Sequence, residues 1–588
     1  MSSPSEAGAA GVSERHALPA VPHAPVSLRG RADGYWRYLK TPAGQRRAAW
    51  FVVYLAAALF ILLVGQHALV RHIAYHDDGF DMGNMDQAVW NTLHGHPFRF
   101  TNRAEDWNGP PTRLGIHVEP ILLLIAPLYL IHSGPETLIA LQTVAFALGA
   151  LPLFLLGLRR MPGLPLVAAA FAVAYLASPA VVGASLWDFH AVALATPLLL
   201  LALWALDARR FGWFILAALL AMLTKEDVGL SLIPLGVYIA LWLRRPRLGG
   251  VVGVVALAWV ALCFAVILPH FNGGASGGNT YWYRYAQFGA TPRDAVLTIL
   301  THPWLPLAFV LGDAARRAYL GILLRMGGGL GLFAPLLWIC ALPELAVNTL
   351  SGHAEQYSGF FQYNAMLGAY LMAAGVYGAA ALYDARRRAE TVAASHADAD
   401  LPRTADTRDP LVSKGSCLTT RPPLLPARIR PLLNRAAAGW HRALERLPIP
   451  SRWLPWLVVA WLLVTGVWNL AAIQPRLGDF WGVGAVANPQ QPAIDALLAR
   501  VPADASVAAT DTLNPHLSDR YTIYLLPDPQ SYVAEYVAFD ISNASPERQA
   551  GDQNVYARML ASGHYRVVGT AGSAILLRRT GAPLAPPT

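Results

Sequence analysis

Long apolar blocks separated by short polar segments make up most of this chain. Several blocks have about 20 residues, the length that an α-helix needs to cross the hydrocarbon core of a bilayer. The run 120–131 is too short to cross alone, so we expect it to be re-entrant or to lead into the next helix. The candidate spans are 48–70, 120–132, 136–158, 164–186, 189–206, 211–224, 228–243, 249–269, 296–312, 319–342, 363–383 and 453–474. The pattern predicts an all-α polytopic membrane protein with about eleven transmembrane helices.

Basic residues recur between the predicted spans and set the expected orientation. Loops rich in Lys and Arg stay on the cytoplasmic side, so the disordered basic leader 1–47 and the N-terminus should be cytoplasmic. The first apolar block begins far behind this leader, which indicates a retained helix rather than a cleaved signal peptide. The alternation requires 211–224 and 228–243 to form a helical hairpin. The other groups expected on the cytoplasmic side are Arg159 and Arg160, Arg209 and Arg210, Arg244 to Arg247, Arg316 and Arg317, and Arg386 to Arg388.

Changes in composition divide the chain into five parts. After the leader, 48–383 is predicted to be the transmembrane core, with an Asp-rich first outer loop at 71–118. Segment 384–452 is basic and Pro-rich and is predicted to be a cytoplasmic loop whose first half is disordered. Helix 453–474 then carries the chain outward.

The tail 485–580 has the pattern of a small extracytoplasmic α/β domain. Pro492 to Val501 is predicted to be a short amphipathic helix. Period-two alternation predicts strands at Ser506 to Thr510, Thr522 to Leu526, Tyr532 to Phe539 and Tyr565 to Leu577.

The amino-acid composition is typical of a membrane protein and indicates which partner the basic residues face. Hydrophobic residues make up 55% of the chain and charged residues 14%, whereas soluble chains carry about 25% charged residues. The net charge of +9 is explained by loops that face the anionic cytoplasmic leaflet, so the lipid bilayer and not nucleic acid is the expected partner. Cys263, Cys340 and Cys417 are far apart, which indicates neither a disulfide framework nor a zinc site.

The first outer loop holds the densest cluster of carboxylates. Asp77, Asp78, Asp81 and Asp86 fall within ten residues, directly after a predicted span. Crowded carboxylates repel one another unless they bind a cation, pair with bases or share protons. The four are therefore candidate catalytic residues, because a carboxylate can act as a general base. Asp78 and Asp81 are one helical turn apart and are candidate ligands of a divalent cation such as Mg²⁺ or Mn²⁺, which prefers oxygen ligands. The alternative is a solvated acidic loop.

Apolar residues within this loop recur at helical spacing. Met82, Met85, Val89 and Leu93 form a narrow stripe. The stripe predicts a short helix that lies along the membrane surface and holds the carboxylates at the boundary between lipid and water.

Two further polar motifs stand at predicted helix ends. His117 and Glu119 close the first outer loop, and Asp188 and His190 lie at the outer junction between 164–186 and 189–206. Ionisable residues beside a spanning segment are often functional, so all four are candidate substrate-binding or phosphate-binding residues. The alternative is an interfacial turn, with Trp187 in the aromatic belt.

Three charged residues interrupt an otherwise apolar stretch at Lys225, Glu226 and Asp227. A charge at the centre of a bilayer costs about 2.5–3.5 kcal/mol on insertion scales, so the triplet must pair internally or line a cavity. The hairpin brings it toward the side of the first-loop carboxylates. Lys225 is suited to meeting a phosphate as a point charge. A structural ion pair is the alternative.

Two other predicted outer segments carry weaker signals. Gly273 to Tyr285 is rich in glycine and aromatic residues, and its aromatic side chains with Arg284 are suited to covering a sugar or a lipid. It is not a phosphate-binding P-loop, because the Lys-Ser/Thr ending is missing. The remaining polar residues in predicted outer loops are Glu344, His353, Glu355, Gln356 and Tyr357.

These motifs together resemble those of a bacterial family of polytopic membrane proteins named domain of unknown function 2079. Two aspartates stand in tandem before Gly79, where such families often have one. The resemblance runs from about residue 70 onward, except in the basic loop. The matching segments are DMGNMDQAVWNTLHGHPF (81–98), HVEPILLLIAPLY (117–129), WDFHAVALATP (187–197), TKEDVGL (224–230) and DTLNPHLSDR (511–520).

That family in turn resembles the GT-C glycosyltransferase superfamily. The resemblance implies a bacterial plasma-membrane enzyme that transfers a sugar from a polyprenyl-phosphate donor to an acceptor on the extracytoplasmic side. One of Asp77, Asp78 or Asp81 would deprotonate the acceptor or hold a cation. Lys225, with His117 or His190, would neutralise the departing phosphate. The alternatives are a transporter or flippase for a lipid-linked or polar solute and a non-catalytic membrane scaffold.

Overall fold

The computed structural model describes most of the chain, which divides into two units between Ala48 and Ala49. The contacts discussed below lie within the second unit. The predicted disorder of the leader and of the basic loop falls mostly outside the described residues. These are 37–102, 109–273, 281–397, 439, 443–475, 477–478, 488–540 and 546–584.

Among the described residues, six helices are long and apolar enough to cross a membrane, or up to seven if a bent pair counts as one span. Four further apolar helices have only 10–17 residues, so the predicted number of about eleven spans stays a prediction. The first long helix combines α2 (Pro42–Phe60), a π-helical turn and α3 (Gln66–Ile73). The other helices of the core include α6 (Pro135–Arg160), α7 (Pro165–Leu176), α8 (Pro179–Leu186), α9 (Ala195–Asp207), α10 (Phe211–Met222), α11 (Val228–Leu241), α12 (Pro246–Leu262), α18 (Ala365–Ala397) and α20 (Leu454–Ala472).

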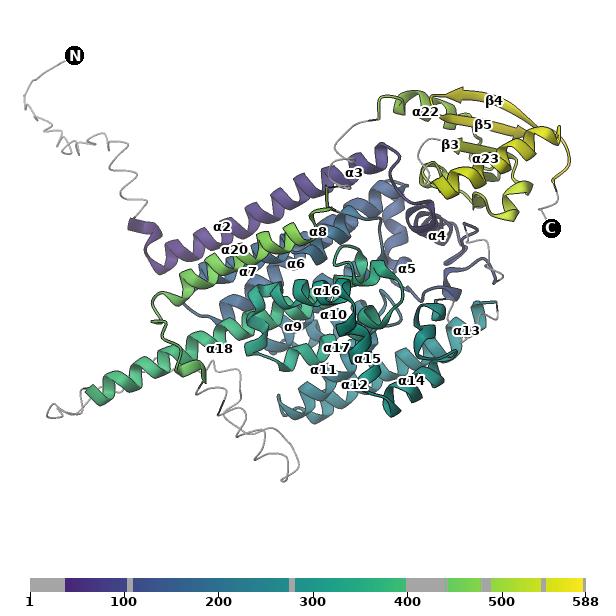
Figure 1. Ribbon diagram of the computed structural model, residues 1–588. Coiled ribbons are helices and arrows are strands. Elements are labelled where there is room, and N and C mark those ends of the chain that lie inside the picture. The colour runs from purple at the N-terminus through teal and green to yellow at the C-terminus, as the bar shows by residue number, and fades with distance from the viewer. Residues whose placement is uncertain are drawn as a thin grey trace, which may run out of the picture. The chain divides into compact units, whose positions relative to one another are not determined.

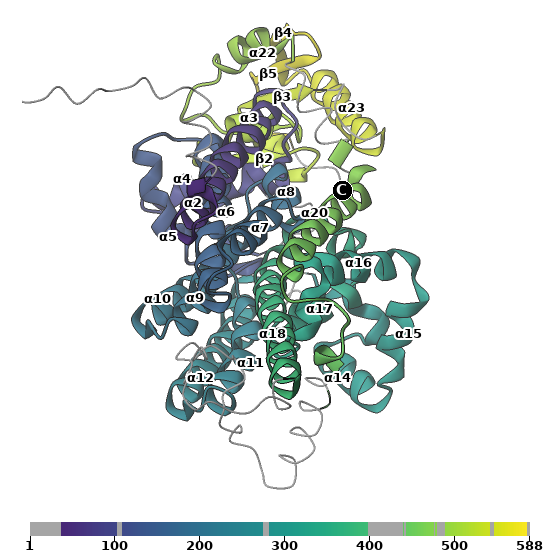
Figure 2. The ribbon, with the colours of Figure 1, turned by 90° about the vertical axis from the view of Figure 1, so that its left-hand side faces the viewer.

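Helix α18 lies at the centre of the core, where it packs against α6, α9 and α17 (Leu336–Leu350) (Figure 2). Its most apolar window is 89% buried inside the protein, whereas that of α12 is only 17% buried. Small residues permit this close packing. A Cβ atom at Gly378 would lie 1.7 Å from the backbone oxygen of Leu330. The helix continues beyond the predicted span 363–383 to Ala397, because Ala, Arg and Glu in the following segment favour helix.

The predicted span 319–342 is also wrong as a single helix. Helix α16 (Ala314–Arg325) ends where Gly327, Gly328 and Gly329 take φ values of 59°, 72° and 68°, a region that glycine enters at little steric cost. The chain then continues into α17. Glu344, predicted in an outer loop, lies inside α17.

The start of α16 and the end of α17 lie together. The Arg316 side chain donates hydrogen bonds to the backbone oxygens of Thr349 at 2.9 Å and Ser351 at 2.7 Å. The positive-inside prediction placed Arg316 and Arg317 on the cytoplasmic side of the membrane and the 343–357 segment on the outer side. These hydrogen bonds show that Arg316 and the end of α17 lie together, so the prediction is wrong for this pair. The preceding candidate span 296–312 is not straight either, since α14 (Pro292–Thr301) and α15 (Trp304–Gly312) belong to a pair bent by 94°.

The first loop folds into short helical segments. The π-helical turn Gly79–Gly83 leads into α4 (Asn84–Leu93), as the apolar stripe predicted. The segment 120–131 forms only α5 (Leu122–Ile125) and a 3-10 turn before α6 begins. It therefore does not cross as a helix.

The tail forms a five-stranded sheet with strand order β2-β1-β3-β5-β4. Strand β1 pairs in parallel with β2 and β3, and β5 pairs antiparallel with β3 and β4. Helix α22 (Gln491–Leu498) covers one face, and α23 (Pro546–Ala561) packs on the other (Figure 1). The strands are β1 (Val507–Ala509), β2 (Ile523–Leu525), β3 (Tyr536–Asp540), β4 (Tyr565–Ala571) and β5 (Ala574–Arg579).

The predicted all-α membrane core with a small α/β tail is confirmed, with three corrections in the tail. The strand predicted at Tyr532 to Phe539 begins only at Tyr536, because Pro529–Val533 forms a 3-10 turn. The last predicted strand, 565–577, is two strands joined by a turn at Gly572, where φ is 58°. Helix α23 was not predicted. The apolar Val555 and Met559 that face the sheet occupy only its C-terminal half, so no apolar stripe runs along the whole helix.

Candidate active site

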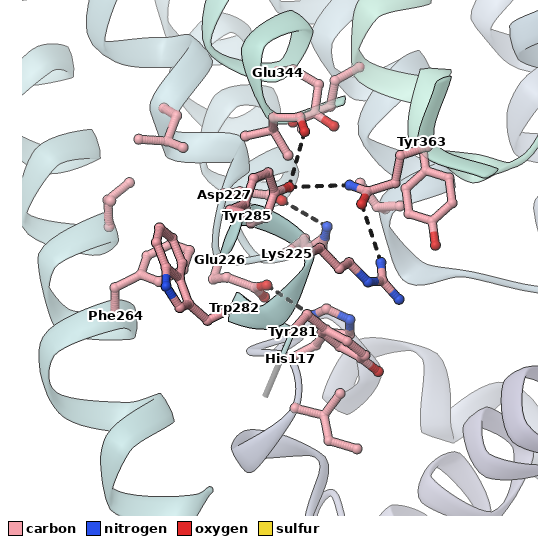
Figure 3. Close-up of a pocket in the computed structure, with 18 of the residues that line it drawn as sticks. His117, Lys225, Glu226, Asp227, Phe264, Tyr281, Trp282, Tyr285, Glu344 and Tyr363 are labelled. Carbon is pink, nitrogen blue, oxygen red and sulfur yellow. Dashed lines mark hydrogen bonds and ion pairs between the residues drawn. The ribbon is translucent and has the colours of Figure 1, made fainter. Parts of the chain in front are cut away.

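A cavity of about 850 Å³ lies among polar residues from distant parts of the chain. Its lining includes Asp81 of the first loop, His190 and the charged triplet that begins at Lys225. Figure 3 shows this triplet facing aromatic residues of the 281–288 segment. The cavity therefore brings together charged residues that are far apart in the sequence. Asp81 and Glu344, for example, are separated by 263 residues and both line it.

The charged triplet sits on the turn between α10 and α11, which form the predicted hairpin. Lys225 Nζ lies 2.7 Å from Asp227 Oδ2. Glu226 Oε1 lies 2.8 Å from His117 Nδ1, and its other oxygen accepts a hydrogen bond from the backbone N–H of Val118 at 3.0 Å. Burial opposes ionisation of Glu226, but the His117 contact outweighs it and lowers the pKa of Glu226 to about 2. The triplet both pairs internally and lines the cavity.

Asp81 is the first-loop carboxylate that faces the cavity. Trp187 Nε1–H donates a hydrogen bond to Asp81 Oδ2 at 3.0 Å, and His190 Nε2 lies 3.5 Å from Asp81 Oδ1. Burial would raise the pKa of Asp81, but His190 and these hydrogen bonds hold it below its usual range. The carboxylate is therefore ionised near neutral pH and can accept a proton.

Two arginines line the cavity beside the residues that the sequence singled out. The Arg113 guanidinium pairs with Glu119 at 2.7 Å and contacts Asn84. The Arg284 guanidinium lies 4.3 Å above the Tyr281 ring, in a cation–π arrangement, and 3.4 Å from Gln356 Oε1. Arg113 was missed because nothing in its neighbourhood along the chain marks it; only its partner Glu119 was noted.

Arg284 and Glu344 differ from the other charged lining residues in their pairing. Among the described residues, no carboxylate lies within 4 Å of the Arg284 guanidinium, and its Nε–H has no acceptor. Glu344 is only 6% exposed, and within the described parts of the chain no hydrogen bond to it is found. Arg113 and Lys225 are already neutralised by a carboxylate, so Arg284 is the cation best able to take an anionic ligand.

One wall of the cavity is apolar and reaches the surface of the protein. It includes Leu257, Phe264 and Val296 from α12, the segment that follows it, and α14. Leu257 is 58% exposed and Val296 is 56% exposed. The cavity therefore has two different ends. One end is lined by charged side chains, and the other opens between exposed apolar side chains of α12 and α14.

The other predicted site residues lie outside the lining of this cavity. Asp77 is buried against His72, with 2.5 Å between Oδ2 and Nδ1. Asp78 Oδ1 caps the π-helical turn by accepting hydrogen bonds from the backbone N–H groups of Phe80 and Asp81. Asp188 Oδ2 accepts a hydrogen bond from the backbone N–H of Asp78 at 2.8 Å.

Asp86 is buried away from the cavity. It accepts hydrogen bonds from the hydroxyls of Tyr129 and Ser518, each at 2.5 Å. Burial and the nearby Asp519 carboxyl raise the pKa of Asp86 well above its usual value. Its contacts join the first loop to the tail.

The proposed cation ligands Asp78 and Asp81 do not converge. Asp78 caps the turn, and Asp81 points toward Trp187 and His190. Within the described ranges, no group of three or more His, Cys, Asp or Glu side chains is arranged to hold a metal ion. The described side chains therefore show no cation site at Asp78 and Asp81, and the divalent cation stays a prediction.

Several solved structures are similar to the chain along most of its length, and two of them represent the range. ArnT from Cupriavidus metallidurans bound to undecaprenyl phosphate has a TM-score of 0.47 at 15% identity, and the match covers 91% of this chain and 99% of that one. The oligosaccharyltransferase from Archaeoglobus fulgidus in the apo form has a TM-score of 0.38 at 13% identity, with coverage of 91% and 75%. No curated protein matches the chain.

A family model matches residues 71–397, which include the first loop, the charged triplet and the cavity. The match takes in more than half of the chain, and its description agrees with the apolar helices. The chain belongs to the family of predicted membrane proteins described as DUF2079.

Proposed function

We propose that this protein is a membrane glycosyltransferase of the GT-C type. It would transfer a sugar from a polyprenyl-phosphate donor to an acceptor hydroxyl on the extracytoplasmic side. The observation that carries the proposal is the cavity, which combines an ionised carboxylate, an apolar mouth and an arginine that pairs with no carboxylate among the residues that the structure describes. A polyprenyl-phosphate sugar needs these surroundings for its reacting carbon, its phosphate and its hydrocarbon chain.

The charged end of the cavity suits the departing phosphate. Arg284 offers guanidinium donors to phosphate oxygens in a geometry that favours bidentate contacts, and Lys225 adds a nearby positive charge. Positive groups placed where negative charge develops lower the barrier to transfer more than most other terms. Arg284 rather than Lys225 carries most of this effect, because Asp227 already neutralises Lys225.

Asp81 is the proposed general base. The acceptor oxygen attacks the anomeric carbon, its proton passes to the Asp81 carboxylate, and the bond from that carbon to the phosphate oxygen breaks with its electrons on the phosphate. A direct displacement of this kind inverts the anomeric centre. Trp187 and His190 hold the carboxylate in place, which general base catalysis requires.

Replacement of the base and the two cations tests the proposal. Asp81→Asn, Arg284→Ala and Lys225→Ala should each lower the rate of sugar transfer from prenyl-phosphate donors, at least 100-fold for Asp81→Asn. Matched controls are Asp294→Asn and Arg293→Ala, which change exposed residues of α14 outside the cavity lining. Transfer that persists at the wild-type rate in all three cavity variants would contradict the mechanism.

A further inference from the structure

The turn that carries Asp81 is held between the core and the tail. On the core side, Asp188 accepts a hydrogen bond from the backbone N–H of Asp78 at 2.8 Å. On the tail side, Asp511 Oδ1 accepts a hydrogen bond from the next backbone N–H, that of Gly79, also at 2.8 Å. Two consecutive backbone amides are thus fixed by carboxylates from opposite sides.

The tail also holds the same turn through a pair of buried amides. Asn102 Nδ2–H donates hydrogen bonds to Gly79 O at 2.5 Å and to Asn514 Oδ1 at 2.8 Å, and Asn514 Nδ2–H donates to Asn102 Oδ1 at 2.9 Å. Both asparagines are completely buried. Removing one partner of a buried pair leaves polar atoms without hydrogen bonds, which costs more than the net gain of the bond itself.

Two glycines let the tail approach the turn closely. A Cβ atom at Gly83 would lie 2.1 Å from Asn514 Oδ1, and one at Gly79 would lie 2.8 Å from the Asn514 Cβ. Any larger residue at these positions would push Asn514 away. The backbone on either side of Asp81 therefore rests directly on Asn514.

The sheet fixes the position of Asn514 in turn. Its backbone N–H donates a hydrogen bond to Thr510 O at 2.9 Å, directly after β1. The Thr101 side chain of the first loop both donates to and accepts from the backbone of Ile523 in β2, at 2.7 Å and 2.9 Å. The contact thus rests on two strands of the sheet.

We infer that Asp511 and Asn514 of the C-terminal domain are positioning residues for Asp81, so that this domain is part of the transfer machinery. The inference rests on the proposed function. Asp511 and Asn514 touch the backbone that carries Asp81 and do not line the cavity. Their effect is on where the Asp81 carboxylate lies, and a displacement of about 1 Å at a reacting group can lower a rate about 100-fold.

The test compares Asn514→Ala and Asp511→Ala, which each remove the side chain that contacts the turn, with matched controls in the full chain. The controls are Asn488→Ala and Asp504→Ala, which change tail residues that make no described contact with the first loop. We expect hydrogen–deuterium exchange of the 78–86 segment to become faster in the variants at Asn514 and Asp511 and to stay unchanged in the two controls. We also expect kcat for transfer to fall at least tenfold while the KM for the prenyl-phosphate donor stays within about twofold, because the cavity lining is unchanged.

A double-variant cycle separates positioning from loss of the fold. Gly83→Ala drives its new methyl group into Asn514, so Gly83→Ala and Asn514→Ala break the same contact. The double variant should lose no more kcat than the worse single variant, whereas independent defects would multiply. Wild-type kcat in Asn514→Ala, or unchanged exchange of the 78–86 segment, would overturn the inference. Absence of transfer by the wild-type protein would instead remove the proposed function, with the exchange result still reporting the contact.

Discussion

Four aspartates of the first loop, which the sequence groups together, have four different surroundings. Asp77 pairs with His72, Asp78 caps a turn, Asp81 faces the cavity and Asp86 joins the loop to the tail. The chemistry of a carboxylate is set by such partners and by its burial. Only the contacts of Asp81 leave it ionised beside a cavity large enough for a substrate.

Asp86 should therefore matter for stability. Asp86→Ala leaves the buried hydroxyls of Tyr129 and Ser518 without an acceptor, and we expect the free energy of unfolding to fall by about 1–3 kcal/mol. Asp86→Asn keeps an acceptor oxygen, and burial already raises the pKa of this carboxyl, so its loss should be smaller. Thermal unfolding of the purified protein would measure both. A larger loss in the Asn variant would contradict this account.

His516 gives the stability of the protein a predicted pH dependence. Its ring stacks on His72 with 4.3 Å between centroids and also faces Tyr75, Asp77 and Glu136. Burial, together with the His72 ring, lowers the pKa of His516 to about 3. Between pH 6.5 and 3 the unfolded chain binds a proton that the folded protein does not, so acidification favours unfolding.

The slope from this one group should approach about 1.4 kcal/mol per pH unit. His516→Phe retains the ring and removes the titration. Its unfolding temperature should therefore vary less between pH 7 and pH 5 than that of the wild type. An equal slope in both proteins would show that other groups set the dependence.

At the scale of elements, backbone contacts at glycine fix how α18 packs in the core. Gly378 of α18 lies against the backbone of Leu330, in the segment that joins α16 to α17. A contact with backbone cannot be relieved by turning a side chain. Gly378 has an ordinary helical φ that any residue could adopt. Glycine is therefore needed here only because there is no space for a side chain.

Gly378→Ala should destabilise the core by about 1–3 kcal/mol, the usual cost of overpacking, or more if the segment cannot move. The matched control is Gly466→Ala in α20, where an added Cβ atom would meet nothing within 4 Å. Unfolding temperature and the yield of monodisperse protein would compare the two variants. Equal behaviour of both would contradict the packing argument.

At the scale of the whole molecule, the cavity joins groups from the first loop, the α10–α11 turn and α17 to an apolar surface of α12 and α14. A hydrocarbon chain that moves from lipid onto this surface gains van der Waals packing rather than hydrophobic burial, because lipid tails are themselves apolar. The mouth at Leu257 and Val296 therefore offers affinity that depends on the length of the chain.

Leu257→Glu places a charge at this mouth. We expect the KM for a long polyprenyl-phosphate sugar to rise at least tenfold, and the KM for a donor with a ten-carbon chain to change little. Leu300→Glu is the matched control, since Leu300 is an exposed residue of α14 that does not line the cavity. Transfer assays with both donors would measure the difference, and equal effects of the two substitutions would exclude this route of entry.

Local sequence patterns sufficed to predict the membrane class, most of the helices and the approximate places of most tail strands, and they singled out the Lys225 triplet as a candidate site. These follow from local patterns, because apolar length, alternation and isolated charge are all read within about 20 residues. Sequence patterns did not reveal the break after α16, since three glycines in an apolar run permit a helix as well as a turn.

Which of the charged side chains share a cavity became visible only in the folded protein. The tertiary structure brought Asp81, Arg113, Arg284 and Glu344 to the Lys225 turn, and it gave Asp86 and Asn514 their place between loop and tail. Contacts between residues that are hundreds of positions apart produce no recognisable pattern in the sequence around either residue. The role of an ionisable side chain depends on the charges and the burial around it, and packing alone supplies both.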